Sequence, residues 1–317
     1  MPDSIISDIY RNFDTALAAF YEGAATGISA YVIPIAWVLL GICMLVWCYL
    51  VIEGRVASPL TDWFLKFIGF LLVLYVLGNG YLAWVAKPLM NLPSELTSAM
   101  SGSQGNATDL LGQVNEKVVD LVSAMFTAGN QLIKDFAIGP AIALFLMAIL
   151  VIVAIYLLLS IALFSVIFSK LGLSLVLAVG PFFLLGLVLP QTRSYFFSWL
   201  NTAFYFVFYH VFTALFIFMF IGIVDSYIGK LNQRLQGENA SAGTLAMVSN
   251  LTGVGDAGLN VAAICIPIML ISITMFFMFL QIPAMCASLT NGSGGSFGAG
   301  LTNLTHARSL FRGSRSK

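Results

Sequence analysis

Charge is scarce in this chain. Of its 317 residues only 9% are Asp, Glu, Lys or Arg, whereas 60% are hydrophobic, and the mean hydropathy is +0.96. A soluble domain has roughly 25% charged residues, which supply the polar surface that covers its core. The composition therefore excludes a water-soluble globular fold. The formal net charge is +0, so the total charge predicts neither an acidic nor a basic partner.

Residue types that catalyse reactions or bind metals are also few. The chain has two histidines, His210 and His306, and neither an HExxH pair nor a GxxxxGK phosphate loop. Its four cysteines lie in apolar segments without CxxC spacing, which predicts no metal site and no disulfide framework. The segment GGSFG around Ser296 matches a nucleophile elbow, but it lies in a Gly/Ser-rich stretch and lacks the strand–turn–helix context. We therefore expect no catalytic activity and no cofactor.

Long uncharged segments are abundant. Six are at least about as long as the roughly 20 residues that a helix needs to cross a bilayer: 23–52, 67–86, 136–169, 171–192, 194–224 and 257–307. Because lipid tolerates only helices and closed barrels, we predict an all-α, polytopic membrane protein. It has five transmembrane helices plus a re-entrant segment at 171–189, or six spans if that segment crosses fully. Amphipathic interfacial helices accompany the spans.

Three of these segments contain a break or are unusually long. The second span contains Gly78, Asn79 and Gly80, which predict a kink. The segment 136–169 would be about 51 Å long as a helix, so it must tilt strongly or project from the roughly 30 Å hydrocarbon core. Gly180 and Pro181 break or bend the segment that follows.

Four charged residues are concentrated between the first two spans: Glu53, Arg55, Asp62 and Lys66. Irregular charged segments belong at the membrane surface, so we predict a short loop at 53–66. Trp and Lys suit the headgroup boundary. Glu53, Arg55, Trp63 and Lys66 are therefore the predicted anchors of this loop.

Helical periodicity appears in two further segments. Apolar residues recur at helical spacing near the N-terminus, at Ile5, Ile9, Phe13, Leu17 and Phe20. They also recur within 87–135, at Leu111, Val114, Val118, Leu121, Val122 and Met125. Both patterns predict amphipathic helices, and we expect the second to lie on the bilayer or to pack against a partner, with the bilayer favoured.

Counted over all loops, the placement of Lys and Arg slightly favours six spans, but without the long loop 87–135, where the rule is diluted, it favours five, which we prefer. In that topology 1–22 is a periplasmic amphipathic helix, and the hairpin 23–86 contains the cytoplasmic loop 53–66. A periplasmic loop at 87–135 follows. The hydrophobic core 136–290 contains the periplasmic loop 225–260, and the Gly/Ser linker and basic tail 291–317 are cytoplasmic. Lys170 lies on the cytoplasmic side. Six spans with both ends in the cytoplasm are the alternative.

His210 is the ionisable group expected at membrane depth. It could be a proton relay, but hydrogen bonding to a neighbouring helix is the more common role of such a histidine. A transporter is disfavoured because no Asp, Glu, Lys or Arg falls inside a predicted span and no inverted halves are visible. Gly23 and Gly27 form a GxxxG pattern, which predicts close packing of helices.

One stretch resembles a known family. The segment GPFFLLGLVLPQTRSYFFSWLNT at 180–202 is similar to the hallmark region of TrbL-like inner-membrane subunits of bacterial type IV secretion systems. The matching positions include Gly180, Pro181, Thr192, Arg193 and Trp199. The resemblance implies that this hinge contributes to assembly. From the residues alone, Arg193 and Trp199 form an anchor pair at the membrane interface.

The resemblance implies a channel or scaffold component of a conjugation apparatus in the bacterial inner membrane, with a periplasmic N-terminus and a cytoplasmic C-terminus. It further implies a ring-like homo-oligomer, a pentamer as a guess from the family, beneath the pilus. The implied partners are membrane lipid, the stalk or minor pilin subunit, other inner-membrane secretion subunits, secretion ATPases and translocated DNA or protein. A stand-alone secondary transporter or small channel that needs His210 is the alternative. An intramembrane enzyme is the weakest hypothesis.

Overall fold

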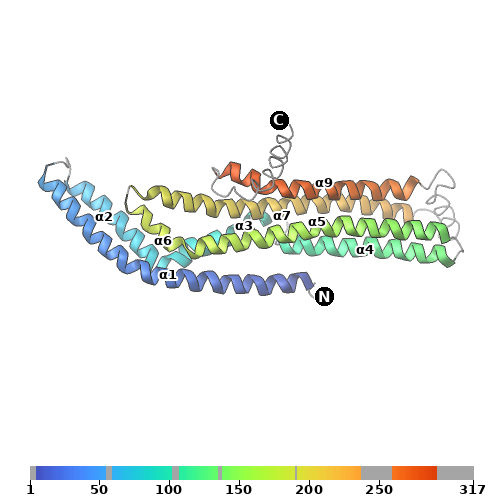
Figure 1. The fold of residues 1–317 in the computed structure, drawn as a ribbon, viewed down its shortest axis with the longest axis horizontal. Coiled ribbons are helices and arrows are strands. Elements are labelled where there is room, and N and C mark those ends of the chain that lie inside the picture. Colours follow the sequence, from blue (N-terminus) through green and yellow to red (C-terminus); the bar gives the residue numbers. More distant parts are fainter. Residues whose placement is uncertain are drawn as a thin grey trace, which may run out of the picture. The chain divides into compact units, whose positions relative to one another are not determined.

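The computed structural model describes the backbone of residues 5–54, 59–101, 107–134, 138–189, 191–236 and 259–290 (Figure 1). Its elements are α1 (Ile5–Ile52), α2 (Pro59–Tyr75), the π-helix η1 (Val76–Ala86), α3 (Lys87–Ser101), α4 (Ala107–Lys134), α5 (Ile138–Ala178), α6 (Gly180–Leu184), the 3₁₀ turn η2 (Leu185–Leu187), α7 (Arg193–Gln236) and α9 (Leu259–Leu289). All regular structure in these ranges is helical, which confirms the predicted fold class.

Four helices are long and apolar enough to cross a membrane: Asn12–Ile52, Phe145–Ala178, Arg193–Ser226 and Ile266–Leu289. A bent pair, Phe67–Gly78 with Gly80–Met100, raises the number to five if it is one span. At 1.5 Å per residue, the 41 residues of α5 extend about 61 Å. Even a 40° tilt leaves about 47 Å along the membrane normal, so α5 projects beyond the hydrocarbon core.

The segment 171–189 is not a separate span. Residues up to Ala178 continue α5, and the chain then forms only the five residues of α6 and the three of η2 before α7 begins. The described structure therefore has neither a re-entrant helical hairpin nor a sixth crossing at this place. Gly180 and Pro181 break the helix where the sequence predicted a break.

The chain forms two compact units. The bundle unit comprises Met1–Asp8, Thr97–Ile167 and Val211–Ile282. The hinge unit comprises Ile9–Leu96, Phe168–His210 and Pro283–Lys317. Both α5 and α7 contribute residues to each unit.

In the hinge unit, one face of α1 packs against α2, η1 and the end of α5. The buried face repeats every three or four residues, at Leu17, Tyr21, Ala25, Ser29, Val32 and Ala36. This face differs from the predicted one, because Phe20 is exposed and Tyr21 is buried. α1 also continues unbroken past residue 22, so the predicted N-terminal helix and the first span are one helix.

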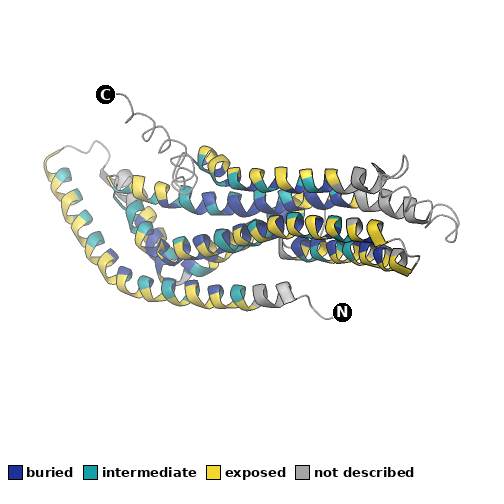
Figure 2. Cartoon of the chain, turned by 45° about the vertical axis from the view of Figure 1, so that its right-hand side comes forward, coloured by how far each residue is buried: buried dark blue, intermediate teal, exposed yellow. Residues whose placement is uncertain are grey.

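Beyond Ala36, α1 keeps one half-buried face, and its other sides are exposed (Figure 2). Leu45, Tyr49 and Ile52 are among its exposed apolar residues, and Phe64 and Leu72 continue this surface on α2. A helix that is apolar all round is typical of a membrane span. The α1–α2 hairpin therefore presents its surface to lipid or to other membrane subunits.

The predicted loop 53–66 is shorter in the structure. α2 begins at Pro59, so Trp63 and Lys66 lie in its first turns, and their side chains are outside the described set. Glu53 accepts a hydrogen bond from the Tyr49 hydroxyl at 2.5 Å. Gly54 has a φ of 71°, a conformation that glycine adopts readily at helix C-termini. Arg55 lies outside the described residues.

The second predicted span bends strongly, as its glycines indicated. The axes of Phe67–Gly78 and Gly80–Met100 differ by 94°. The bend falls within the π-helix η1, and π-helical turns and glycines are common causes of such kinks. The bend places Tyr81 against the end of α5, as described below.

In the bundle unit, α4 packs its apolar face against the chain's own helices. Its buried residues are Leu110, Leu111, Val114, Val118, Leu121 and Met125. A void of about 10 Å³ is lined from α4, α5, α7 and α9, which shows that these four helices converge. The Tyr156 hydroxyl donates to Asn115 Oδ1 at 3.1 Å, and the rings of Phe126 and Phe145 lie 5.3 Å apart. This face is therefore covered by protein, whereas the sequence favoured the bilayer surface.

Candidate functional site: the hinge between α5 and α7

The hinge begins with a backbone carbonyl that its own helix cannot satisfy. In an α-helix the carbonyl of Leu177 accepts from the N–H of residue 181. Residue 181 is a proline and has no N–H. The hydroxyl of Tyr81, a side chain from η1, donates to this carbonyl at 2.5 Å. A side chain 96 positions earlier in the sequence thus replaces the helix donor.

A second side chain closes the same helix end. The indole Nε1 of Trp199, on α7, donates to the carbonyl of Val176 at 2.8 Å. Trp199 is only 4% exposed, and its ring stacks on Phe183 with centroids 6.5 Å apart. Tyr81 and Trp199 therefore link η1 and α7 to the broken end of α5.

Gly180 allows these two rings to approach the chain. A Cβ atom at this position would lie 1.9 Å from the Tyr81 hydroxyl oxygen and 2.7 Å from Trp199 Cζ2. Both distances are far shorter than a real Cβ contact. No other amino acid fits here unless one of the rings moves.

The turn that returns to α7 is closed by its polar residues. The hydroxyl of Thr192 donates to the carbonyls of Gly186, at 2.9 Å, and Leu189, at 3.1 Å. Nε of Arg193 donates to the carbonyl of Leu187 at 3.4 Å. Both residues thus satisfy carbonyls of η2 and of the turn that follows it.

The structure brings the five predicted hinge residues, Gly180, Pro181, Thr192, Arg193 and Trp199, into one region. Tyr81 was missed by the sequence analysis. The signal that could have found it is a tyrosine directly after Gly80 in an apolar span, since a buried hydroxyl requires a partner. One interpretation was wrong: Trp199 is buried beneath the hinge, so it does not form an interface anchor pair with the exposed Arg193.

Polar side chains also meet between α5 and α7. The Ser169 hydroxyl lies 2.9 Å from Nδ1 of His210, and both residues are buried. This is the bond to a neighbouring helix that the sequence favoured for His210.

Lys170 lies within the candidate span Phe145–Ala178, although no charged residue was expected inside a span. Its Nζ is 2.7 Å from Oδ1 of Asp14 on α1, and the two side chains are 9% and 45% exposed. Residues in contact cannot lie on opposite sides of a bilayer. The predicted topology placed Lys170 in the cytoplasm and Asp14 in the periplasm, and this combination was wrong.

Metal binding finds no support in the described ranges, where no three His, Cys, Asp or Glu side chains form a group that could hold an ion. The contacts at the hinge are instead hydrogen bonds to backbone carbonyls and packed aromatic rings. Such contacts fix the angle between two membrane helices.

A comparison with protein families identifies the family to which the chain belongs. A family model described as TrbL/VirB6 plasmid conjugal transfer protein matches residues 40–254, which include the α1–α2 turn, the hinge and α7. The match covers more than half of the chain, and the chain belongs to this family. No curated protein matches the chain closely enough to be compared with it. The protein is thus a multi-pass component of a conjugal transfer or type IV secretion system, and the resemblance found in the sequence is confirmed.

Proposed function

We propose that this protein is a channel or scaffold subunit of the type IV secretion apparatus in the bacterial inner membrane. It assists the transfer of DNA or protein by assembly and not by catalysis. The observation that carries this proposal is the family match over residues 40–254, which contains the whole hinge. The partners are the stalk or minor pilin subunit, other inner-membrane subunits and the secretion ATPases.

Self-association is the second part of the proposal, with a pentameric ring as the working number. Gly23 and Gly27 support it, because a Cβ atom at either position would meet nothing within 4 Å. The small-residue face of α1 is thus not used within the described part of the chain. Small residues at this spacing let two membrane helices approach closely. The exposed α1–α2 hairpin offers further apolar surface to a neighbouring copy.

The proposal is tested by purifying a C-terminally tagged chain from its native host in mild detergent, with mass spectrometry of the proteins that co-elute. We expect secretion ATPases and pilus-biogenesis subunits in one large assembly. Gly27→Leu should reduce the assembly, whereas Gly222→Leu, at an open glycine of α7, should not. A monomer or dimer without these partners would overturn the proposal.

A stand-alone transporter or small channel is a second candidate, favoured by the polar contacts at Lys170 and His210. Ionisable groups at membrane depth commonly mark ion or substrate pathways. If the protein is such a transporter, we expect a substrate-dependent flux when the purified protein is placed in liposomes. We expect His210→Phe to abolish this flux. The transporter hypothesis is rejected if the chain shows no flux in liposomes and nevertheless restores secretion in a host that lacks it.

A further inference from the structure

A cavity of about 350 Å³ lies beside the hinge. Leu39 of α1 forms one wall, and the segment from Phe182 to Tyr195 forms the others. Cavities that hold small molecules typically measure about 300–1,000 Å³. The cavity is therefore large enough for part of a ligand, and all of its lining belongs to the hinge unit.

The interior of the cavity is suited to hydrocarbon. Its lining consists of leucine and phenylalanine side chains together with Gly186, Thr192 and Tyr195. The Thr192 hydroxyl already donates to two backbone carbonyls. A polar ligand would exchange its hydration for an apolar surface, which is unfavourable. An acyl chain meets no such penalty.

The rim has the opposite character. Arg193 directly follows the lining residue Thr192 and is exposed, and only its Nε donates to a described residue, the carbonyl of Leu187. No Asp or Glu occurs anywhere between Asp135 and Asp225, so this segment supplies no carboxylate to balance the guanidinium. Tyr195, in the first turn of α7, lines the cavity, is 64% exposed and carries a hydroxyl. The rim is thus positive and rich in donors, which is the chemistry that binds phosphate.

From the limits of the candidate spans, we expect the hinge at the headgroup level. One candidate span ends at Ala178 and the next begins at Arg193. The connection between two antiparallel spans lies at a membrane surface, where phosphate groups are found and where Arg and Tyr are common. An apolar cavity that opens beside a positive rim at this depth matches a phospholipid in both of its parts.

We propose that the cavity holds an acyl chain of one anionic phospholipid, whose phosphate is bound by Arg193 and Tyr195. The acyl chain then lies against Phe183, the ring on which Trp199 stacks. The lipid completes the packing of the hinge on the side that the protein leaves open.

Trp199 provides a reporter for this site, because it is buried away from bulk lipid and one ring away from the cavity. In a chain with Trp37, Trp47, Trp63 and Trp84 changed to Phe, its fluorescence is recorded in nanodiscs of phosphatidylcholine. A few per cent of brominated phosphatidylglycerol is added, or the same fraction of brominated phosphatidylcholine. We expect several-fold stronger quenching by phosphatidylglycerol.

Three variants complete the test. Arg193→Gln should reduce quenching by phosphatidylglycerol to the level of phosphatidylcholine. Lys87→Gln removes an exposed cation outside the cavity and should leave the preference unchanged. Leu39→Phe, which fills the cavity from α1, should reduce quenching by both lipids. Equal quenching by the two lipids in the parent, or an unchanged preference in Arg193→Gln, would overturn the proposal.

Native mass spectrometry repeats the comparison on the full chain with all its tryptophans. We expect one phosphatidylglycerol retained per chain and at least several-fold fewer in Arg193→Gln. Retention that is equal in the two chains contradicts the proposal. Neither experiment involves the secretion apparatus, so the outcome is independent of the proposed function.

Discussion

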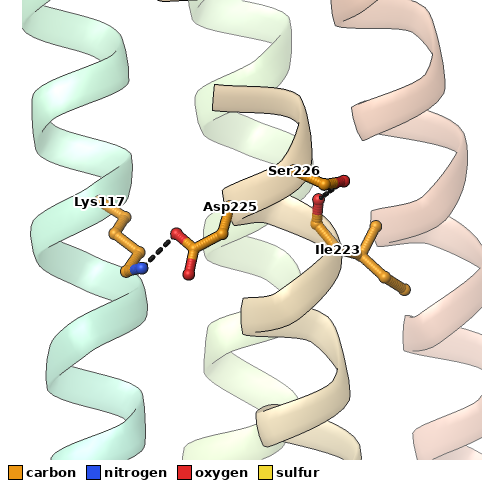
Figure 3. A network of polar contacts seen from close by, with 4 residues as sticks. All are labelled: Lys117, Ile223, Asp225 and Ser226. Carbon is orange, nitrogen blue, oxygen red and sulfur yellow. Dashed lines mark hydrogen bonds and ion pairs between the residues drawn. The ribbon is translucent and has the colours of Figure 1, made fainter. Parts of the chain in front are cut away.

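The hinge unit and the bundle unit both bury apolar faces, but they differ in their polar contacts. In the bundle, α4 buries a periodic apolar face, and the ion pair between Lys117 and Asp225 joins partly exposed side chains (Figure 3). At the hinge, Tyr81 and Trp199 donate hydrogen bonds to carbonyls at the broken end of α5. An unsatisfied buried carbonyl costs about 1–3 kcal/mol, whereas an exposed ion pair contributes about 0–1 kcal/mol. The buried hydrogen bonds therefore contribute more to the hinge than the exposed ion pair contributes to the bundle.

The largest expected effect is that of Gly180→Leu. Its side chain would displace both Tyr81 and Trp199, and we expect a loss of more than ~3 kcal/mol of unfolding free energy. Gly222→Leu is the matched control, because a Cβ atom at that glycine of α7 meets nothing within 4 Å. Denaturant unfolding in detergent measures both. Equal stability of the two variants contradicts the described hinge packing.

Tyr81→Phe should cost about 2 kcal/mol, because it removes the donor to the carbonyl of Leu177 and keeps the ring. The same change in a Pro181→Ala background should cost less, since residue 181 then has an N–H to donate. A double-mutant cycle of unfolding free energies measures this coupling. Additive costs would show that Tyr81 does not replace the missing helix donor.

Asp14→Asn should cost about 2 kcal/mol. Removing one partner of a fully buried ion pair costs about 3–5 kcal/mol, and the partial exposure of Asp14 lowers this value. Lys170→Met should cost less than Asp14→Asn, because it removes the buried charge itself. Unfolding of the two variants in detergent decides the order. The reverse order would mean that the Lys170 ammonium does not depend on the Asp14 carboxylate.

The smallest effect is expected in the bundle. Lys117→Met should change the unfolding free energy by about 0.5 kcal/mol, and Asp225→Asn by a similar amount, because both side chains are partly exposed. Thermal unfolding at low and high salt provides the measurement. A loss as large as that of Tyr81→Phe would remove the difference between the two units.

The sequence predicted the local features of this structure and missed the contacts between residues that are far apart in the chain. The stripe from Leu111 to Met125 and the break at Gly180-Pro181 are local patterns, and the structure contains both. The hydrogen bond of Tyr81 to Leu177 and the ion pair of Asp14 with Lys170 join positions 96 and 156 residues apart. The periodicity of apolar residues along the sequence does not predict which residues form such pairs. Lys170 in particular was interpreted as the boundary of a span, because the sequence does not show that Asp14 is its partner.

Plasmid transfer by the native host tests most directly whether the hinge serves the secretion apparatus. The measurement compares Trp199→Phe, which removes the donor to Val176, with Trp84→Phe at an exposed tryptophan of η1. With both variants present in the membrane at the level of the unmodified chain, we predict that transfer falls at least about tenfold for Trp199→Phe only. Equal transfer by the two variants would contradict a role of the hinge in secretion.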